Sequence, residues 1–224
     1  MATPTVLDEK RKVRLVKWAS WASVALALAL LVMKAYAWSV SSSVSVLASA
    51  LDSFMDVGAS LISFFAIRYA LQPADTEHRF GHGKAEALAA FMQSCLILLT
   101  AFSLVVTAVK RLLGESVIAE SSQAEMIMLL SIILSIVLVL FQRYVVKQTA
   151  SQAIKADSAH YISDIWSNAL VLLALFLDSW GFGGADPLLA IFVAIYIFRE
   201  AVKILREAFD VLMDHELSSE ATDR

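Results

Sequence analysis

The chain has 224 residues, of which 59% are hydrophobic and 17% are charged, and its mean hydropathy is +0.71. Soluble proteins average roughly 45–50% apolar and about 25% charged residues, so the composition excludes an ordinary soluble domain and indicates a polytopic membrane protein. The net charge of −3 gives no basic character that would favour nucleic acid, and we expect no nucleic-acid partner.

Six apolar segments along the chain predict an all-α fold with six transmembrane helices. The first five cover approximately residues 14–36, 41–70, 84–113, 124–146 and 156–177, and the sixth begins after Asp186 and Pro187. We therefore expect a short N-terminal segment at 1–13, followed by one six-helix transmembrane domain at 14–213.

The distribution of Lys and Arg predicts which ends of these helices face the cytoplasm. With both termini on one side, fifteen of the 18 Lys and Arg residues lie on that side, and only Lys34, Lys110 and Arg111 lie on the other. Basic residues accumulate on the cytoplasmic side of membrane proteins. Both termini are therefore expected in the cytoplasm, with the helices embedded in the lipid bilayer.

Two pairs of metal-type ligands lie inside segments that otherwise have the pattern of membrane-spanning helices. Asp52 and Asp56 form one pair, and His160 and Asp164 form the other. The i, i+4 spacing puts both side chains of a pair on one helical face. A carboxylate at bilayer depth costs about 2.5–3.5 kcal/mol, so three carboxylates with an imidazole indicate a bound cation. One nitrogen and three oxygens suit tetrahedral Zn²⁺, and the set also accepts Cd²⁺, Fe²⁺ or Mn²⁺.

The residues next to these pairs predict how the two helices meet. Gly58 and Ser163 are small, and small residues let helices approach closely in a membrane. Asp157 lies at the expected start of the fifth helix, where an N-cap role is favoured over a place among the ligands.

The loop between the second and third segments holds a second candidate site. Asp75, His78 and His82 are three metal-type ligands within eight residues at the cytoplasmic end of the bundle. The alternative is a solvated polar loop that binds no metal. Lys84 and Glu86 begin the third segment, where interfacial charges are ordinary, and a contact of Lys84 across subunits stays open.

Four runs of sequence resemble the cation diffusion facilitators, and in particular the bacterial zinc and ferrous-iron efflux transporters. They are LDSFMDVGAS at 51–60, LQPAD at 71–75, FGHGKAE at 80–86 and HYISD at 160–164. The resemblance covers essentially the whole chain. It implies a homodimer of six-helix protomers in the bacterial cytoplasmic (inner) membrane that exports metal in exchange for protons by alternating access.

The resemblance also implies roles for individual residues. These are an intramembrane transport site at Asp52, Asp56, His160 and Asp164, a loop site at Asp75, His78 and His82, and a dimer charge interlock at Lys84 and Asp214. It favours Zn²⁺ and Cd²⁺, and in some members Fe²⁺. The family usually continues into a cytoplasmic metal-binding domain, so residues 214–224 are expected to begin the linker to a domain that this chain lacks.

These observations predict a divalent metal/proton antiporter, not an enzyme, that exports Zn²⁺ from the cytoplasm. His160 is the expected main proton-exchanging group, because histidine changes its charge near neutral pH. A passive metal channel or a metal sensor using the same ligands is the alternative. A membrane metalloenzyme based on His78 and His82 is disfavoured, because such enzymes need more histidines than the four present.

Overall fold

The computed structural model describes residues 6–41, 44–79, 81–113, 122–179 and 186–214. In these ranges the chain is mostly helical, and no strand occurs among them. The helices are α1 (Val6–Ser41), α2 (Val44–Ala70), α3 (Lys84–Leu112), α4 (Ser122–Thr149), α5 (Gln152–Ser179) and α6 (Asp186–Leu212). The predicted all-α fold is confirmed. Of the expected terminal segments, residues 1–5 and 215–224 lie outside the described residues.

The helices are long enough to cross a bilayer. They have 27 to 36 residues, which at 1.5 Å per residue corresponds to roughly 40–54 Å, against a hydrocarbon thickness of about 30 Å. Three of them, α1, α4 and α5, reach beyond both ends of their expected apolar segments, whereas α2 and α3 stay within theirs. In particular, α1 begins at Val6, inside the expected N-terminal segment 1–13. Polar turns at the helix ends are therefore continuous with the apolar spans.

Four of the described helices are also apolar enough to span a membrane. The qualifying stretches are Asp8–Val40 in α1, Ser49–Ala70 in α2, Lys84–Lys110 in α3 and Met126–Thr149 in α4. Among the described residues, α5 carries Lys155, Asp157 and Asp164, and α6 carries Arg199, Glu200 and Lys203 in its middle. Composition alone thus supports four of the six expected crossings.

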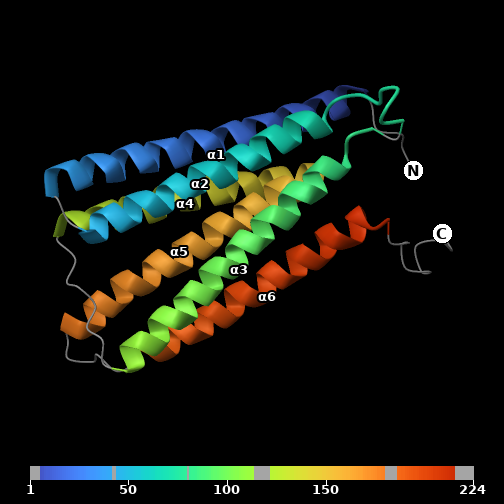
Figure 1. The fold of residues 1–224 in the computed structure, drawn as a ribbon. Helices are drawn as coiled ribbons and strands as arrows, with labels where there is room; N and C mark the ends of the chain where they lie inside the picture. The colour runs from blue at the N-terminus through green and yellow to red at the C-terminus, as the bar shows by residue number, and fades with distance from the viewer. Residues whose placement is uncertain (1–5, 42–43, 80, 114–121, 180–185, 215–224) are drawn as a thin grey trace.

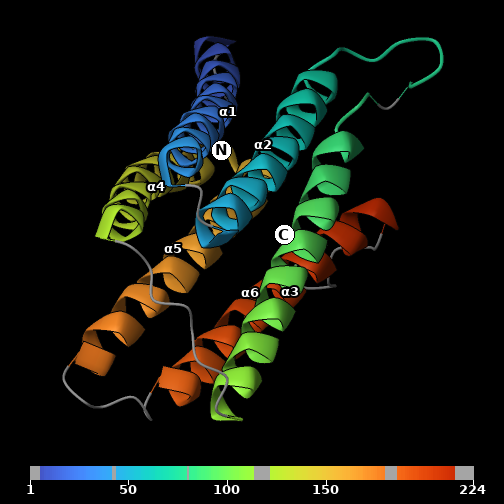
Figure 2. The same cartoon turned by 60° about the vertical axis from the view of Figure 1, so that its left-hand side comes forward.

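The helices are arranged around α5. In Figure 1, α1 lies beside α2 and α3 lies beside α6, and Figure 2 shows α5 between these two pairs. Among the described residues, α5 contacts each of the other five helices. The start of α1, the end of α6 and the loop between α2 and α3 lie at one end of the bundle (Figure 1). Candidate ligands on α5 are therefore placed at the centre of the molecule.

Small side chains let the helices pack closely around this centre. Buried positions are rich in alanine and serine, including Ala59 on α2, Ala89 on α3 and Ala156 on α5. Larger residues fill the spaces between neighbouring helices. For example, Ile97 on α3 and Ile197 on α6 belong to one buried cluster. Small buried residues are the usual means of tight helix packing in a membrane, where lipid is as apolar as the core.

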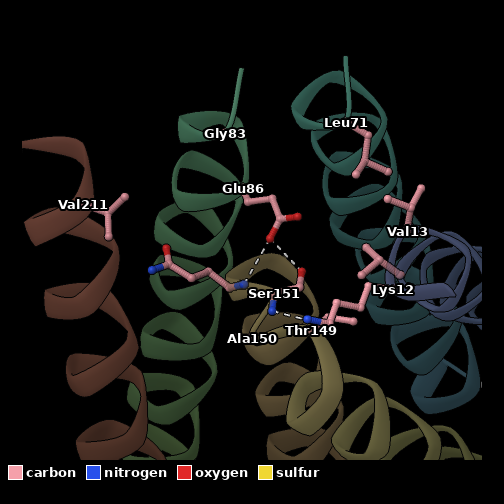
Figure 3. A pocket seen from close by; sticks show the side chains of 11 residues that line it. Lys12, Val13, Leu71, Gly83, Glu86, Thr149, Ala150, Ser151 and Val211 are labelled. Carbon is pink, nitrogen blue, oxygen red and sulfur yellow. Dashed lines mark hydrogen bonds between the residues drawn. The ribbon is translucent and has the colours of Figure 1, made fainter. Parts of the chain in front are cut away.

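A carboxylate from α3 organises the tight turn between α4 and α5. Glu86 Oε2 accepts hydrogen bonds from Ser151 Oγ at 2.7 Å and from the backbone N–H of Gln152 at 3.1 Å. Ser151 Oγ in turn accepts from the N–H of Ile154 at 3.4 Å, so Ser151 is the N-cap of α5. Figure 3 shows Glu86 reaching this turn in a pocket of 350 Å³ that Lys12 also lines. The contact fixes the start of α5 against α3.

Candidate metal sites

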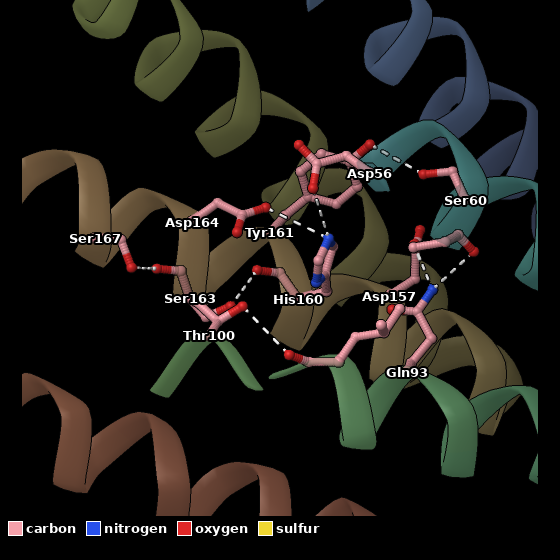
Figure 4. A network of polar contacts seen from close by, with 12 residues as sticks. Asp56, Ser60, Gln93, Thr100, Asp157, His160, Tyr161, Ser163, Asp164 and Ser167 are labelled. Atoms are coloured by element: carbon pink, nitrogen blue, oxygen red, sulfur yellow. Dashed lines mark hydrogen bonds and ion pairs between the residues drawn. The ribbon is translucent and has the colours of Figure 1, made fainter. Parts of the chain in front are cut away.

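The first candidate site lies where α2 meets α5. Asp56, His160 and Asp164 each offer a ligand atom, and these atoms lie within 4.8 Å of one another. His160 Nε2 is 3.2 Å from Asp56 Oδ1 and 3.6 Å from Asp164 Oδ2. The His160 side chain is only 6% exposed, while the two carboxylates are about one-fifth to one-quarter exposed, at 21% and 24%. Figure 4 shows the imidazole pointing toward both carboxylates.

These separations fit a tetrahedral metal centre. With metal–ligand bonds of about 2.0–2.2 Å, two ligands of a tetrahedral Zn²⁺ are about 3.4 Å apart. The two distances from His160 Nε2, at 3.2 and 3.6 Å, bracket this value. His160 Nδ1 is buried and has no hydrogen-bond partner among the described residues, so Nε2 is the nitrogen presented to the carboxylates.

Asp52, the fourth expected ligand, lies one turn before Asp56 on α2. Its side chain is exposed, and it does not belong to the group formed by the other three residues. The i, i+4 spacing nevertheless keeps Asp52 next to Asp56 on the helix surface. The structure therefore brings together three of the four predicted ligands.

The helix that carries His160 is held by further buried polar contacts. Ser163 Oγ donates to the His160 carbonyl at 2.6 Å, and the Tyr161 hydroxyl donates to the Ser23 carbonyl on α1 at 3.1 Å. Asp157, one turn before His160, accepts hydrogen bonds from side chains of α3 and α4 (Figure 4). These contacts fix the face that α5 presents to α2.

Two predictions about the neighbouring residues are wrong. Asp157 is not an N-cap, because α5 begins at Gln152 and Asp157 is fully buried inside the helix. Gly58 is exposed, and a Cβ placed there would meet nothing within 4 Å, so it mediates no close approach within this chain. Ser163, by contrast, is buried where α5 packs against its neighbours, as expected.

The second candidate site lies in the loop between α2 and α3. Asp75, His78 and His82 again place their ligand atoms within 4.8 Å of one another. Asp75 Oδ1 is 3.2 Å from His78 Nδ1, and Asp75 Oδ2 is 3.4 Å from His82 Nε2. His82 is 2% exposed and packs edge-on against Tyr69, whereas the His78 side chain is 45% exposed. The site thus has one buried anchor and two groups open to solvent.

Backbone geometry holds the Asp75 carboxylate in place. The N–H groups of His78 and Glu77 donate to Asp75 Oδ1 at 2.6 and 3.0 Å. The His78 backbone hydrogen bond is the main cause that lowers the pKa of Asp75 below its ordinary value, so this carboxylate is charged at neutral pH. Gly81 has a φ of 82°, in the left-handed region that favours glycine, and its N–H donates to the His78 carbonyl at 3.0 Å.

Lys84 and Asp214, the expected charge interlock, form an ion pair within the single chain. Lys84 Nζ is 2.8 Å from Asp214 Oδ2 and also donates to the Leu212 carbonyl at 3.4 Å. The pair joins the start of α3 to the end of α6. Both side chains are largely exposed, at 54% and 79%, so solvent screens the attraction strongly.

Sequence reasoning missed the roles of three residues that hold α5 in place. Glu86 was interpreted as an ordinary interfacial charge, and it caps α5. Gln93 and Gln142, which hold Asp157, were not singled out at all. The available signal was chemical: an amide inside an apolar helix is costly to bury, so such residues indicate a buried polar partner.

An apolar helical bundle with two clusters of metal-type ligands is typical of a multi-pass membrane protein that binds metal cations. Comparison with known proteins identifies the family. The model of the cation efflux transmembrane domain matches residues 20–213. The chain is 45% identical over 209 residues to the cation-efflux pump FieF of Shewanella oneidensis, covering 93% of this chain and 71% of that protein. It is 43% identical over 207 residues to the cation-efflux pump FieF of Escherichia coli, covering 92% of this chain and 69% of that protein.

The chain therefore belongs to the cation efflux family, the cation diffusion facilitators, and is similar to the FieF pumps. The family resemblance expected from the sequence motifs is confirmed. The family is one of transporters, so the activity of this chain is metal cation efflux across a membrane.

Proposed function

We propose that this protein exchanges a divalent metal ion, Zn²⁺ in the first place and Cd²⁺ or Fe²⁺ as further substrates, for protons. The observation that carries the proposal is the convergence of Asp56, His160 and Asp164 inside otherwise apolar helices. A cluster of two carboxylates and an imidazole at that depth is expensive unless a cation neutralises it. Ligand atoms of this type must lose their protons to bind metal, so metal and protons compete for the same atoms.

The exchange requires the metal site to open alternately to the two sides of the membrane. Asp52 supports this, because it lies one turn from Asp56 but outside the three-residue group. A movement of α2 relative to α5 that brings Asp52 to the ion completes four ligands, and the reverse movement releases one. His160 is the group that we assign to proton exchange, since its Nε2 faces both carboxylates. A metal ion shifts the equilibrium between the two states only by binding one of them more tightly. The gain or loss of Asp52 as a coordinating side chain provides that difference in affinity.

The loop site supplies ions to the central site in this scheme. Asp75 and His78 are open to solvent, and the loop lies at the end of the bundle where α1 begins and α6 ends. We place this end, with both termini, in the cytoplasm of a bacterial cell whose inner membrane the six helices cross. The functional unit is a homodimer, near whose contact the Lys84–Asp214 pair stabilises the end of α6.

The test is Zn²⁺ uptake into proteoliposomes that carry an imposed, inside-acid pH gradient. We expect uptake to follow the gradient, to be lost in His160→Ala, and to persist at saturating Zn²⁺ in the matched control His78→Ala. Uptake retained in His160→Ala would overturn the assignment of the transport site. Uptake that ignores the gradient but is lost in His160→Ala would favour a passive channel instead.

A further inference from the structure

A buried polar cluster lies one helical turn from the candidate transport site and belongs to neither metal site. Its centre is Asp157 on α5, which has no exposed surface. Gln93 on α3 donates from Nε2 to Asp157 Oδ1 at 3.1 Å, and Gln142 on α4 donates from Nε2 to Asp157 Oδ2 at 2.6 Å. Both glutamines are also buried, at 1% and 0% exposure. A carboxylate is costly to bury at this position, so its presence indicates a structural or chemical role.

The same cluster reaches the other ligand-bearing helix. Gln93 Nε2 also lies 2.8 Å from Ser63 Oγ and 3.2 Å from the Ala59 carbonyl, both on α2. Gln93 therefore bridges α2 to α5 through the Asp157 carboxylate, and Gln142 extends the bridge to α4. The cluster of Asp157, Gln93 and Gln142 thus links four helices.

The position of this bridge relates it to the metal ligands. Asp157 precedes His160 by three residues on α5, and Ala59 follows Asp56 by three residues on α2. The two helices run in opposite directions, so both ends of the bridge are displaced toward the same end of the bundle (Figure 1). At 1.5 Å per residue, the displacement is about 4.5 Å along each helix. The bridge and the His160–Asp56 contact are thus adjacent links between the same two helices.

We propose that Asp157 is a positioning residue that fixes the register of α5 against α2, so that His160 and Asp164 meet Asp56 at metal-binding distance. Productive constellations tolerate displacements of only about 0.5 Å, and metal–ligand distances vary by about 0.2 Å. A slide of α5 by a fraction of a turn would separate His160 Nε2 from the Asp56 oxygen that now lies 3.2 Å away. The carboxylate acts through hydrogen bonds to both glutamines, not by touching the ion.

The glutamines show why a carboxylate shape is needed and how a neutral residue could replace it. The Oε1 atoms of Gln93 and Gln142 are buried and accept no hydrogen bond from the described residues. An asparagine at position 157 would accept from one glutamine and donate its amide to the free oxygen of the other after that amide turns over. A leucine would leave two buried amide groups without their acceptor. The two substitutions therefore separate the shape of the cluster from its charge.

The experiment measures Co²⁺ binding to the full chain in nanodiscs, with His78→Ala and His82→Ala in every variant so that only the central site remains. The visible absorption of Co²⁺ reports coordination geometry, and a tetrahedral ion absorbs far more strongly than an octahedral one. We expect Asp157→Leu to weaken Co²⁺ affinity roughly 10–100-fold, as for other residues that orient metal ligands, and to reduce the tetrahedral absorption. Asp157→Asn should retain both within about threefold, because it preserves the bridge.

Two controls separate positioning from a general loss of stability. Ser94→Ala alters a fully buried side chain next to Gln93 whose hydroxyl donates only within α3. It should leave the Co²⁺ spectrum unchanged, whatever it does to the melting temperature. Gln142→Leu breaks the bridge from α4 and should reproduce the Asp157→Leu spectrum in milder form, which keeps the test valid if Asp157→Leu does not fold.

The outcomes also separate this inference from the proposed function on which it rests. An unchanged spectrum and affinity in Asp157→Leu, or in Gln142→Leu if Asp157→Leu does not fold, would overturn the positioning role alone. A loss in Asp157→Asn as large as in Asp157→Leu would overturn it as well, because the charge would then be what matters. If the parent without the loop histidines bound no Co²⁺, the proposed transport site itself would be wrong, and the inference would fall with it.

Discussion

The cap that Glu86 places on α5 allows a stability change to be worked out from distances. Its carboxylate accepts two hydrogen bonds, at 2.7 Å from Ser151 Oγ and at 3.1 Å from the Gln152 N–H. Hydrogen bonds to a charged group contribute about 1.5–3 kcal/mol each. Because Glu86 is partly exposed, we take the lower part of the summed range, and we expect Glu86→Ala to destabilise the fold by about 3–4 kcal/mol.

Glu86→Gln should cost less, about 1–2 kcal/mol, because its amide oxygen still accepts hydrogen bonds without the charge. The assay is equilibrium unfolding in mixed micelles, followed by tryptophan fluorescence. Glu77→Ala is the matched control, since Glu77 is exposed in the loop between α2 and α3. A Glu86→Ala variant within 0.5 kcal/mol of the wild-type protein would refute the reasoning, because it would mean that water replaces the cap at no cost.

Three further predictions concern the loops and the surface. Hydrogen bonds lower the pKa of Asp75 in the folded protein, so the ionised carboxylate stabilises the loop. This stabilisation is fully present above pH 3.8, the ordinary pKa, and is lost as the pH falls through the lower pKa of the folded protein. The ¹³C carboxyl titration should therefore have a midpoint below 3.8, even in His78→Ala, which keeps the backbone donor; a midpoint above 3.8 would contradict this. Ala150→Gly should stabilise the fold by about 0.5–1 kcal/mol in the same unfolding assay, because Ala150 has a left-handed φ of 55° after α4; a loss of stability would count against it. Lys84→Met should change stability by less than about 1 kcal/mol, since its ion pair with Asp214 is exposed, and a larger effect that survives high salt would show that this reasoning is wrong.

The sequence predicted the helices well because apolar length is a local property. All six segments are helical in the described ranges, and the boundaries differ mainly where polar turns extend a helix, as at the start of α1. The loop cluster and the two helical pairs were also accessible, because short loop and i, i+4 spacings bring their members together locally, whereas the contact of Asp56 with His160 depends on the packing of α2 against α5. His160 and Asp164 are one turn apart on α5, and their spacing alone places them on one face.

The contacts between helices could not be predicted in the same way. Asp157 looked like an N-cap because the apolar segment begins near it, but the true cap, Ser151, depends on Glu86 from α3. Gln93 and Asp157 are 64 positions apart in the chain, and only helix packing brings them together. Gly58 suggested a close helix contact, and within this chain its face is open.

The most direct test of metal–proton exchange drives the reaction with zinc alone. Proteoliposomes are loaded with a pH-sensitive dye and no pH gradient is imposed; Zn²⁺ is then added outside, and entry of zinc and the internal pH are followed together. The account predicts that zinc entry makes the lumen alkaline, because each ion that leaves the Asp56–His160–Asp164 site is exchanged for protons moving outward, and that both signals vanish in His160→Ala. Zinc entry at an unchanged internal pH would contradict the account.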